Sequence, residues 1–402
     1  MRKLKTLTLL FLFLFTKTAI SCSGFKLTID NQTMLGLSED YLNPNTIIST
    51  KKATINSFGV IFFGYSETGM DRQSAINDKG LVFDSFAIDE ERKTKSQKGV
   101  KVDGDIAYQL NEDIMTSCSN VNDVIKLLSK YSLEDMGSQW FFADKDGNSI
   151  IVEADTIIKG DKNYQIVTNY NQSQVNSKNP ITCKRYIGAN NILSNKQEFT
   201  KEYGLQLIKA MYQTPSCYAT QYSQLFDLSK GKLYLFLFHN YEEEVEFDIA
   251  SLLNQDLKWV PIQSYFKNKS NYLLELSNYT TTIRITSKMN YLTDKETMTK
   301  YIDSIMSLPF YCTELFRDTI LNIGIYHARN NQNEIAQLIA EKYTYYKLEV
   351  FSISEYLLAY VDYNNKKYST AKMHIDFSLT RRPADQNYLS LEAAIKQRKQ
   401  NK

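Results

Sequence analysis

Glycine and proline are scarce in this chain, with 15 and 6 among 402 residues, and this scarcity argues against long flexible linkers. Histidine occurs only three times, and the five cysteines include no Cys-x-x-Cys pair, so the ligand spacing of a zinc site is missing. The formal net charge is +2 without any basic tract, which gives no reason to expect a nucleic-acid partner. After residue 21 no run of about 18 apolar residues occurs, so we expect no membrane span.

The first 21 residues have the composition of a secretory signal. Basic residues within the first five positions are followed by a mostly apolar run over residues 7–15. Ala19 and Ser21, two small residues, then stand three and one positions before Cys22. Cleavage at this point would make Cys22 the N-terminus of an exported, periplasmic or extracellular protein.

Cys22 has three interpretations. As a new N-terminus it would carry a thiol and a free α-amine, a nucleophile with its own base, as N-terminal nucleophile catalysis requires. Ala-Ile-Ser-Cys is also a passable lipobox, and lipidation would acylate that amine and anchor the protein to a membrane surface. The third interpretation is a cysteine that merely lies near the cleavage point. The odd number of cysteines indicates a free reactive thiol or an intermolecular bridge in an exported protein.

The length predicts two domains or one large one. Residues 22 to about 255 are rich in strand-forming segments, including residues 25–29 and 59–63. Two hairpins are predicted at residues 140–153, around Asp-Gly-Asn, and at residues 222–239, around Ser-Lys-Gly. Ser119 is the predicted N-cap of a helix whose apolar stripe begins at Val121. Helices on the outer faces of sheets favour the α+β class.

From residue 295 to residue 402 the spacing of apolar residues predicts helices. Residues 352–385 fit one tetratricopeptide unit, and the matching positions are Leu358, Ala359, Ala371, Ile375, Ser378 and Pro383. The preceding residues fit the pattern less well, and one and a half repeats cannot form a free-standing solenoid. We therefore expect a helical appendage on the first domain, which either only packs there or binds a protein partner or a second copy of the chain.

Short blocks of sequence follow Cys22 in a defined order. They include residues 36–40 (Gly-Leu-Ser-Glu-Asp), 76–81, 142–148, 167–169 and 184–186. Together with the cleavable cysteine, this series resembles the choloylglycine hydrolase family of linear-amide hydrolases, which includes bile salt hydrolases and penicillin V acylases. Acid ceramidase and penicillin N-acyltransferase relatives are also similar. The resemblance runs from Cys22 to about residue 252, and it implies an αββα four-layer sandwich over residues 22–290.

The resemblance implies roles for individual residues. Cys22 would attack the amide carbonyl while its own α-amine takes the thiol proton. Asp40 would hold that amine, and the side-chain amide of Asn169 would stabilise the oxyanion. Arg185 would lower the pKa of the thiol. The alternatives are a solvated turn carboxylate for Asp40, a turn asparagine for Asn169 and a surface arginine for Arg185.

The chain departs from the family pattern at two positions. Leu37 stands where the family has an arginine, so a charge and five donors are missing. Ala87 falls at a position that supplies an oxyanion or substrate contact, where it offers only its backbone N–H. Both departures argue against a bile salt hydrolase and leave the reaction type unchanged.

The resemblance therefore implies an exported hydrolase that cleaves the carbon–nitrogen bond of an N-acyl amide through an acyl-enzyme on Cys22, without a metal or cofactor. The acyl part is expected to be apolar, because Phe62, Phe63, Phe83 and Phe86 lie in segments that flank the site in relatives. Two alternatives remain. The same fold could act as an acyltransferase, or the chain could be a non-catalytic lipoprotein whose helices bind a partner.

Overall fold

The structure is a computed structural model that describes residues 22–41, 43–66, 70–88, 97–102, 104–134, 136, 138–195, 197–213, 219–306, 313–345, 351–381 and 386–400. The predicted signal sequence (residues 1–21), Cys217, Cys312 and Pro383 lie outside the described residues.

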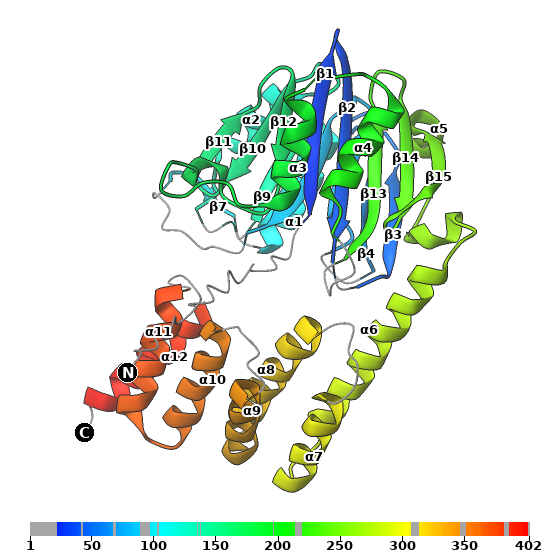
Figure 1. Cartoon of the computed structure of the whole chain (residues 1–402). Helices are drawn as coiled ribbons and strands as arrows, with labels where there is room; N and C mark the ends of the chain where they lie inside the picture. Colours follow the sequence, from blue (N-terminus) through cyan, green and yellow to red (C-terminus); the bar gives the residue numbers. More distant parts are fainter. Residues whose placement is uncertain are drawn as a thin grey trace, which may run out of the picture.

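Two antiparallel sheets make up the first part of the chain (Figure 1). The six-stranded sheet has the order β12 (Tyr164–Val167), β1 (Ser23–Ile29), β2 (Gln32–Asp40), β13 (Thr220–Asp227), β14 (Lys232–Leu237) and β15 (Asn240–Asp248). The eight-stranded sheet has the order β11 (Thr156–Lys159), β10 (Ser149–Glu153), β9 (Ser138–Ala143), β6 (Val82–Ala87), β5 (Ser74–Asn77), β4 (Val60–Tyr65), β3 (Thr46–Lys51) and β16 (Val260–Pro261). A separate parallel pair joins β7 (Val100–Lys101) to β8 (Tyr131–Ser132).

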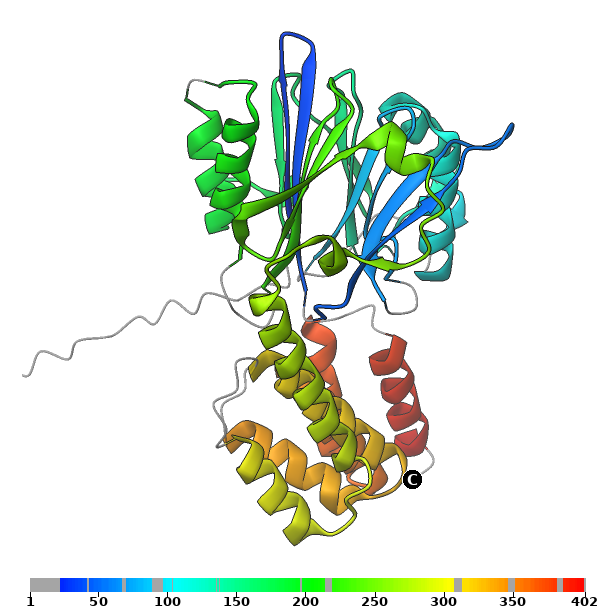
Figure 2. The same ribbon diagram turned by 90° about the vertical axis from the view of Figure 1, so that its right-hand side faces the viewer.

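Helices cover the outer faces of the two sheets. They are α1 (Gly104–Ser117), α2 (Val121–Leu128), α3 (Lys184–Leu193) and α4 (Lys201–Met211), with the short α5 (Ile249–Leu253) after β15. Figure 2 shows α3 and α4 (green) on one side of the sheets and α1 and α2 (cyan) on the other. Mixed helices and antiparallel sheets are what the α+β prediction requires.

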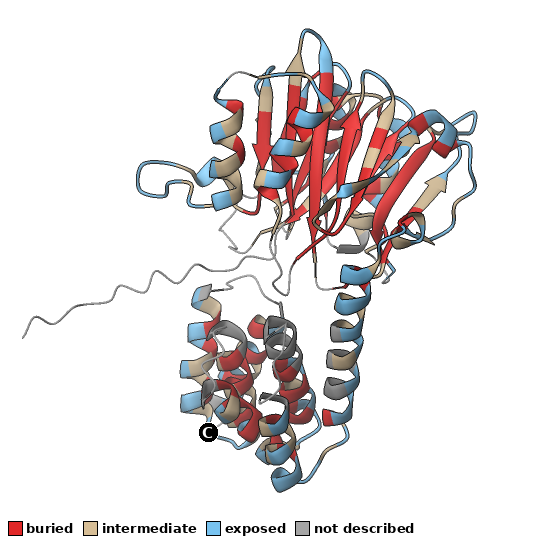
Figure 3. Ribbon diagram, turned by 45° about the vertical axis from the view of Figure 1, so that its right-hand side comes forward, coloured by how far each residue is buried: buried red, intermediate tan, exposed pale blue. Residues whose placement is uncertain are grey.

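Side chains alternate between the two faces of each strand, so each sheet contributes residues to two hydrophobic cores. In β4, Ile61 and Phe63 enter the core between the sheets, whereas Val60 and Phe62 point to the opposite face, against α1 and α2. The six-stranded sheet likewise places Phe25 of β1 under α3 and α4. Because both faces are covered, every residue of β13 is buried, and the strands are mostly red in Figure 3.

The β1–β2 hairpin sets the position of Cys22. Asp30 and Asn31 form its two-residue turn with φ values of 50° and 62°, the left-handed conformation that such turns require. The resulting register pairs Ser23 with Ser38, so Cys22 lies beside the end of β2. Gly36 has a packing role here, because a Cβ atom at this position would collide with the ring of Phe25.

Several local predictions are confirmed. β9 and β10 pair around the Asp-Gly-Asn turn, and β13 and β14 pair around the Ser-Lys-Gly turn. The predicted cap of α2 is wrong, because Asn120 is the N-cap and accepts the backbone N–H of Asp123. The hydroxyl of Ser119 instead donates to the Asp123 carboxylate at 2.6 Å.

The second part of the chain consists of helices. They are α6 (Ser270–Met289), α7 (Lys295–Met306), α8 (Thr313–Arg329), α9 (Asn333–Tyr345), α10 (Phe351–Asn364), α11 (Tyr368–Arg381) and α12 (Gln386–Gln400). Ala359, Ala371, Ile375 and Ser378, from the predicted tetratricopeptide pattern, are buried in α10 and α11. The repeat assignment and the domain boundaries at residues 290 and 295 stay predictions.

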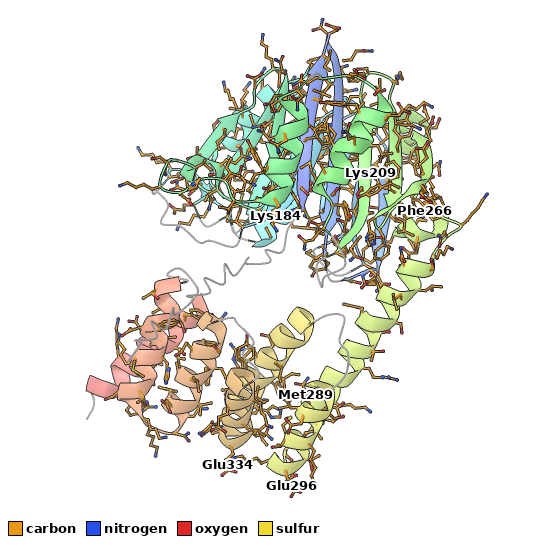
Figure 4. The ribbon with its side chains drawn as sticks, viewed as in Figure 1. Lys184, Lys209, Phe266, Met289, Glu296 and Glu334 are labelled. Carbon is orange, nitrogen blue, oxygen red and sulfur yellow. The ribbon has the colours of Figure 1, made fainter. Side chains whose placement is uncertain are left out.

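Helix α6 joins the two parts. Phe266, just before the helix, and Tyr272, in its first turn, are buried in the core between the sheets. Met289, its last residue, is buried among α7, α8 and α9, and Figure 4 shows Phe266 and Met289 at opposite ends of the helix. Of the helices that the structure describes, none combines the length and apolar character needed to cross a bilayer.

Candidate active site

The predicted residues meet at one end of the six-stranded sheet. Because β1 is antiparallel to both β12 and β2, its start lies beside the ends of those strands. Cys22 precedes β1, Asp40 ends β2, and Asn169 follows β12. Arg185 reaches the same place from the first turn of α3. Four segments distant in the sequence therefore supply one cluster.

Arg185 is the centre of the cluster. Its Nη1 donates to the Asp40 carboxylate at 2.9 Å and to the backbone carbonyl of Cys22 at 3.3 Å. Its Nη2 donates to the Asn169 Oδ1 at 3.3 Å. The planar guanidinium can direct donors to several acceptors at once, which a lysine ammonium does less well. Arg185 thus fixes the positions of the three other predicted residues relative to one another.

Asp40 is held from two sides. Besides Arg185, the Thr220 hydroxyl donates to its Oδ1 at 2.6 Å. Thr220 faces Asp40 at a β-bulge, where the pairing of β2 with β13 shifts register. Burial raises the pKa of the Asp40 carboxyl to about 8, and the neighbouring guanidinium and hydroxyl oppose this rise.

The thiol of Cys22 faces carboxyl groups rather than a cation. Its side chain is nearly buried, with 6% of the residue exposed, and Sγ donates to Glu39 Oε2 at 3.1 Å. Burial raises the pKa of the thiol well above its ordinary value, and Glu39, Asp84 and Asp40 raise it further. Arg185 directs its guanidinium to Asp40 and to the Cys22 carbonyl, and the role predicted for it in lowering the thiol pKa stays a prediction.

Asn169 and Ala87 contact each other. The Asn169 Nδ2 donates to the backbone carbonyl of Ala87 at 2.8 Å, while Asn169 Oδ1 accepts from Arg185. Ala87 was predicted to offer its N–H, and the contact that the structure shows instead uses its carbonyl. One hydrogen of the Asn169 amide is occupied in this way, which leaves the second for an incoming oxyanion.

The predicted aromatic residues divide between two cores. Phe63 and Phe86 lie in the core that contains Cys22, whereas Phe62 and Phe83 lie beneath α1 and α2. Only the first pair is on the same side of the eight-stranded sheet as the thiol. An open groove of about 480 Å³ is lined by Phe62, Arg72, Trp259 and others, but not by Cys22 or the other predicted catalytic residues.

Glu39 and Asp84 were not predicted from the sequence. Glu39 lies within the Gly-Leu-Ser-Glu-Asp block, and its position opposite Cys22 follows from the hairpin register. That register was the one signal that could have identified it. Asp84 lies on β6 of the other sheet, and nothing in the sequence indicates which strand of that sheet faces β2.

No protein-family model matches the chain, and no curated protein matches it. Among solved structures, the chain is similar to an arginine-to-leucine variant of the conjugated bile acid hydrolase from Clostridium perfringens, at 13% identity and a TM-score of 0.47, covering 62% of this chain and 99% of that one. A cysteine-to-alanine mutant of this hydrolase is similar at 13% identity and 0.46, with coverage of 60% and 96%. The penicillin V acylase from Agrobacterium tumefaciens is similar at 15% identity and 0.42, with coverage of 57% and 86%.

Proposed function

We propose that this chain is an exported, thiol-dependent hydrolase of linear carbon–nitrogen amide bonds, built as an N-terminal nucleophile αββα sandwich. The observation that supports this is the cluster of Cys22, Asp40, Asn169 and Arg185. These residues come from four segments and are linked by hydrogen bonds to one guanidinium. An amide hydrolase needs a nucleophile, an oxyanion donor and rigid positioning groups in one place.

The reaction proceeds in two halves. Sγ of Cys22 attacks the carbonyl carbon of the N-acyl amide, and the side-chain amide of Asn169 stabilises the oxyanion. The carbon–nitrogen bond then breaks, the amine leaves with a proton, and the acyl group stays on sulfur as a thioester. Water hydrolyses the thioester and restores the thiol. In the sequence-based hypothesis the α-amine of Cys22 takes the thiol proton, which requires cleavage before this residue.

Asp40 and Arg185 act as positioning residues in this proposal. Arg185 donates to the carbonyl of Cys22, so it fixes the backbone that carries the nucleophile. Asp40, held by Arg185 and Thr220, is the carboxylate that would orient the freed α-amine. Charge-assisted hydrogen bonds of this kind are stronger and more directional than neutral ones.

The test is hydrolysis of a series of N-acyl amide probes by the secreted protein and by a Cys22→Ser variant. We expect the variant to fold and to lose hydrolysis. Cys183→Ser is a matched control, because Cys183 is a free and more exposed thiol that this mechanism does not use. Retained hydrolysis in Cys22→Ser, or its loss in Cys183→Ser, would contradict the proposal. Product analysis with added amines would detect acyl transfer.

Export is part of the proposal, and N-terminal mass analysis tests it. A mature chain that begins with an unmodified Cys22 supports the hydrolase. A chain whose Cys22 carries a diacylglyceryl group and an acylated amine supports the lipid-anchored alternative. Sedimentation of the full chain tests whether the helices of residues 295–402 mediate self-association.

A further inference from the structure

Two buried carboxyl groups lie beside the thiol, and the mechanism above does not use them. Glu39 comes from β2 of one sheet and Asp84 from β6 of the other, and both residues are fully buried. Each carboxyl shifts the pKa of the other, so the two side chains face each other across the core. One oxygen of each, Glu39 Oε1 and Asp84 Oδ2, is buried without a hydrogen-bond partner. A single proton shared by the two carboxyls satisfies both oxygens, whereas two ionised carboxylates would repel each other.

The surroundings decide which carboxyl keeps this proton. Burial raises the pKa of Glu39 to about 7. Burial also raises the pKa of Asp84 well above its ordinary value, and the negative charge of Glu39 raises it further. Asp84 therefore stays protonated and donates to Glu39, which ionises first. Asp84 serves as an internal hydrogen-bond donor.

The second oxygen of Glu39 faces the nucleophile. Cys22 Sγ donates to Glu39 Oε2 at 3.1 Å, and a proton shared with Asp84 would extend this contact into a chain of Asp84, Glu39 and Cys22. The other titratable groups near Glu39 are Asp40, which is engaged by Arg185, and two buried tyrosines, Tyr65 and Tyr222. Burial raises the pKa of both tyrosines, so they stay neutral. Glu39 is thus the ionisable group in direct contact with the thiol.

We propose that Glu39, in place of the α-amine of the sequence-based hypothesis, is the catalytic residue that takes the proton of the Cys22 thiol, and that Asp84 is the positioning residue that holds Glu39 for this transfer. The role in amide hydrolysis rests on the function proposed above; the activation of the thiol does not. In acylation, the proton moves from Sγ to Glu39 Oε2, the sulfur–carbon bond forms, and the carbon–nitrogen bond breaks as Glu39 protonates the leaving amine. In deacylation, water gives its proton to Glu39, the oxygen–carbon bond forms, and the proton returns to sulfur as the thioester breaks.

A competing account predicts the opposite change in the reactivity of Cys22. If Glu39 only repels the thiolate, removal of its charge should make Cys22 more reactive at neutral pH. If Glu39 accepts the proton, removal of its carboxylate should make Cys22 less reactive. The two accounts can therefore be separated with one substitution, Glu39→Gln, which keeps the size of the side chain.

The experiment measures the alkylation rate of Cys22 by iodoacetamide against pH, with mass analysis of the Cys22 peptide. In the unmodified protein we expect the rate to rise through about pH 7 and then level off. In Glu39→Gln this step should disappear, and the rate at pH 8 should fall about 100-fold, at the lower end of proton-transfer effects. Cys118 and Cys183 are internal controls whose rates should not change. An equal or faster rate at Cys22 in Glu39→Gln overturns the proposal.

Substitutions of Asp84 give a second test that leaves Glu39 in place. Asp84→Asn retains an N–H donor to Glu39, so the step should stay near its original pH. Asp84→Leu removes the donor, and the step should move to higher pH because the donor stabilises the ionised form of Glu39. Identical pH profiles for Asp84→Asn and Asp84→Leu overturn the proposal. This comparison does not need the Glu39→Gln protein, so it holds even if Glu39→Gln does not fold.

The hydrolase function and the role of Glu39 can be refuted separately. Alkylation needs no amide substrate, so a pH step that depends on Glu39 in a protein without amide hydrolysis contradicts the hydrolase alone. Full amide hydrolysis by Glu39→Gln, with loss of hydrolysis in Cys22→Ser, contradicts the role of Glu39 alone.

Discussion

The sheets and the helices of this protein bury different kinds of side chain. The two-sheet part buries charged residues in quantity, among them Lys26, Glu39, Asp40 and Asp84. In the described part of α6 to α12, the buried polar residues apart from tyrosines are His327, Ser354 and Ser378, none of which carries a carboxyl group. His327 has partners at both ring nitrogens, Gln332 and the carbonyl of Met289.

This difference separates two uses of a protein interior. Burial of a carboxyl group is unfavourable unless partners or a proton compensate it. Three carboxyls gather around one thiol in the sheets, and perturbed groups concentrated in this way are typical of functional sites. The helices follow the simpler rule of apolar burial.

The largest effect is expected at Arg185. At pH 9, where Asp40 is ionised, Arg185→Ala leaves this buried carboxylate without its cation, and removal of one partner of a buried pair costs about 3–5 kcal/mol. We expect the free energy of unfolding to fall by that amount and hydrolysis to be lost. Arg185→Lys retains the charge but loses the planar donor geometry, so it should recover stability more than activity. Denaturant titration with parallel rate measurements checks both, and an unchanged stability in Arg185→Ala would remove the contrast.

Asn169→Ala should affect rate rather than folding. If the Asn169 amide stabilises the oxyanion, its loss should lower kcat on an N-acyl amide probe by about 10²–10³. Thermal unfolding serves as the control and should show only the cost of two lost hydrogen bonds, to Ala87 and from Arg185. A large loss of stability with a small loss of rate would give Asn169 a structural role instead.

The buried carboxyls predict a pH dependence of stability. The pKa of Glu39 is raised from 4.5 to about 7 in the folded protein, so the folded state retains a proton that the unfolded state has lost. Its contribution is fully present below about pH 4.5 and is lost as the pH rises through about 7, roughly 3 kcal/mol in all. Asp40 acts in the same direction up to about pH 8.

Tryptophan fluorescence reports this dependence specifically, because Trp140 and Trp259 both lie in the sheet-containing part. Urea unfolding at pH 5 and pH 8 should give the lower free energy of unfolding at pH 8. Glu39→Gln should reduce the difference. An equal free energy of unfolding at pH 5 and pH 8 would show that these carboxyls are already ionised at pH 5 in the folded protein.

The smallest effect is expected in the helices. Ile375 is fully buried in α11, and Ile375→Val removes one methylene group from an apolar core. We expect a cost of about 0.5–1.5 kcal/mol, measured by circular dichroism at 222 nm, and no change in the rate of hydrolysis. A change in rate would link the helical core to the site and weaken the contrast between the two parts.

The sequence predicts the local elements well and the contacts between sheets poorly. Turn residues such as Asp-Gly-Asn identify hairpins because the signal lies within a few positions. The site residues Cys22, Asp40, Asn169 and Arg185 could be chosen from ordered sequence blocks, and they do lie together. Asp84 could not, because its position depends on how two whole sheets pack. The cap of α2 was missed because Ser119 and Asn120 are adjacent and both suit the position.

The turn between β1 and β2 has an effect far from its own position. Side chains alternate along a strand, so a shift of the pairing by one residue would exchange the neighbour of Cys22. Ser38 or Asp40 would then take the place of Glu39 beside the sulfur. The turn at Asp30 and Asn31 lies at the distal tip of the hairpin. Its length of two residues thus determines which side-chain oxygen of β2 accepts the hydrogen of the Cys22 thiol.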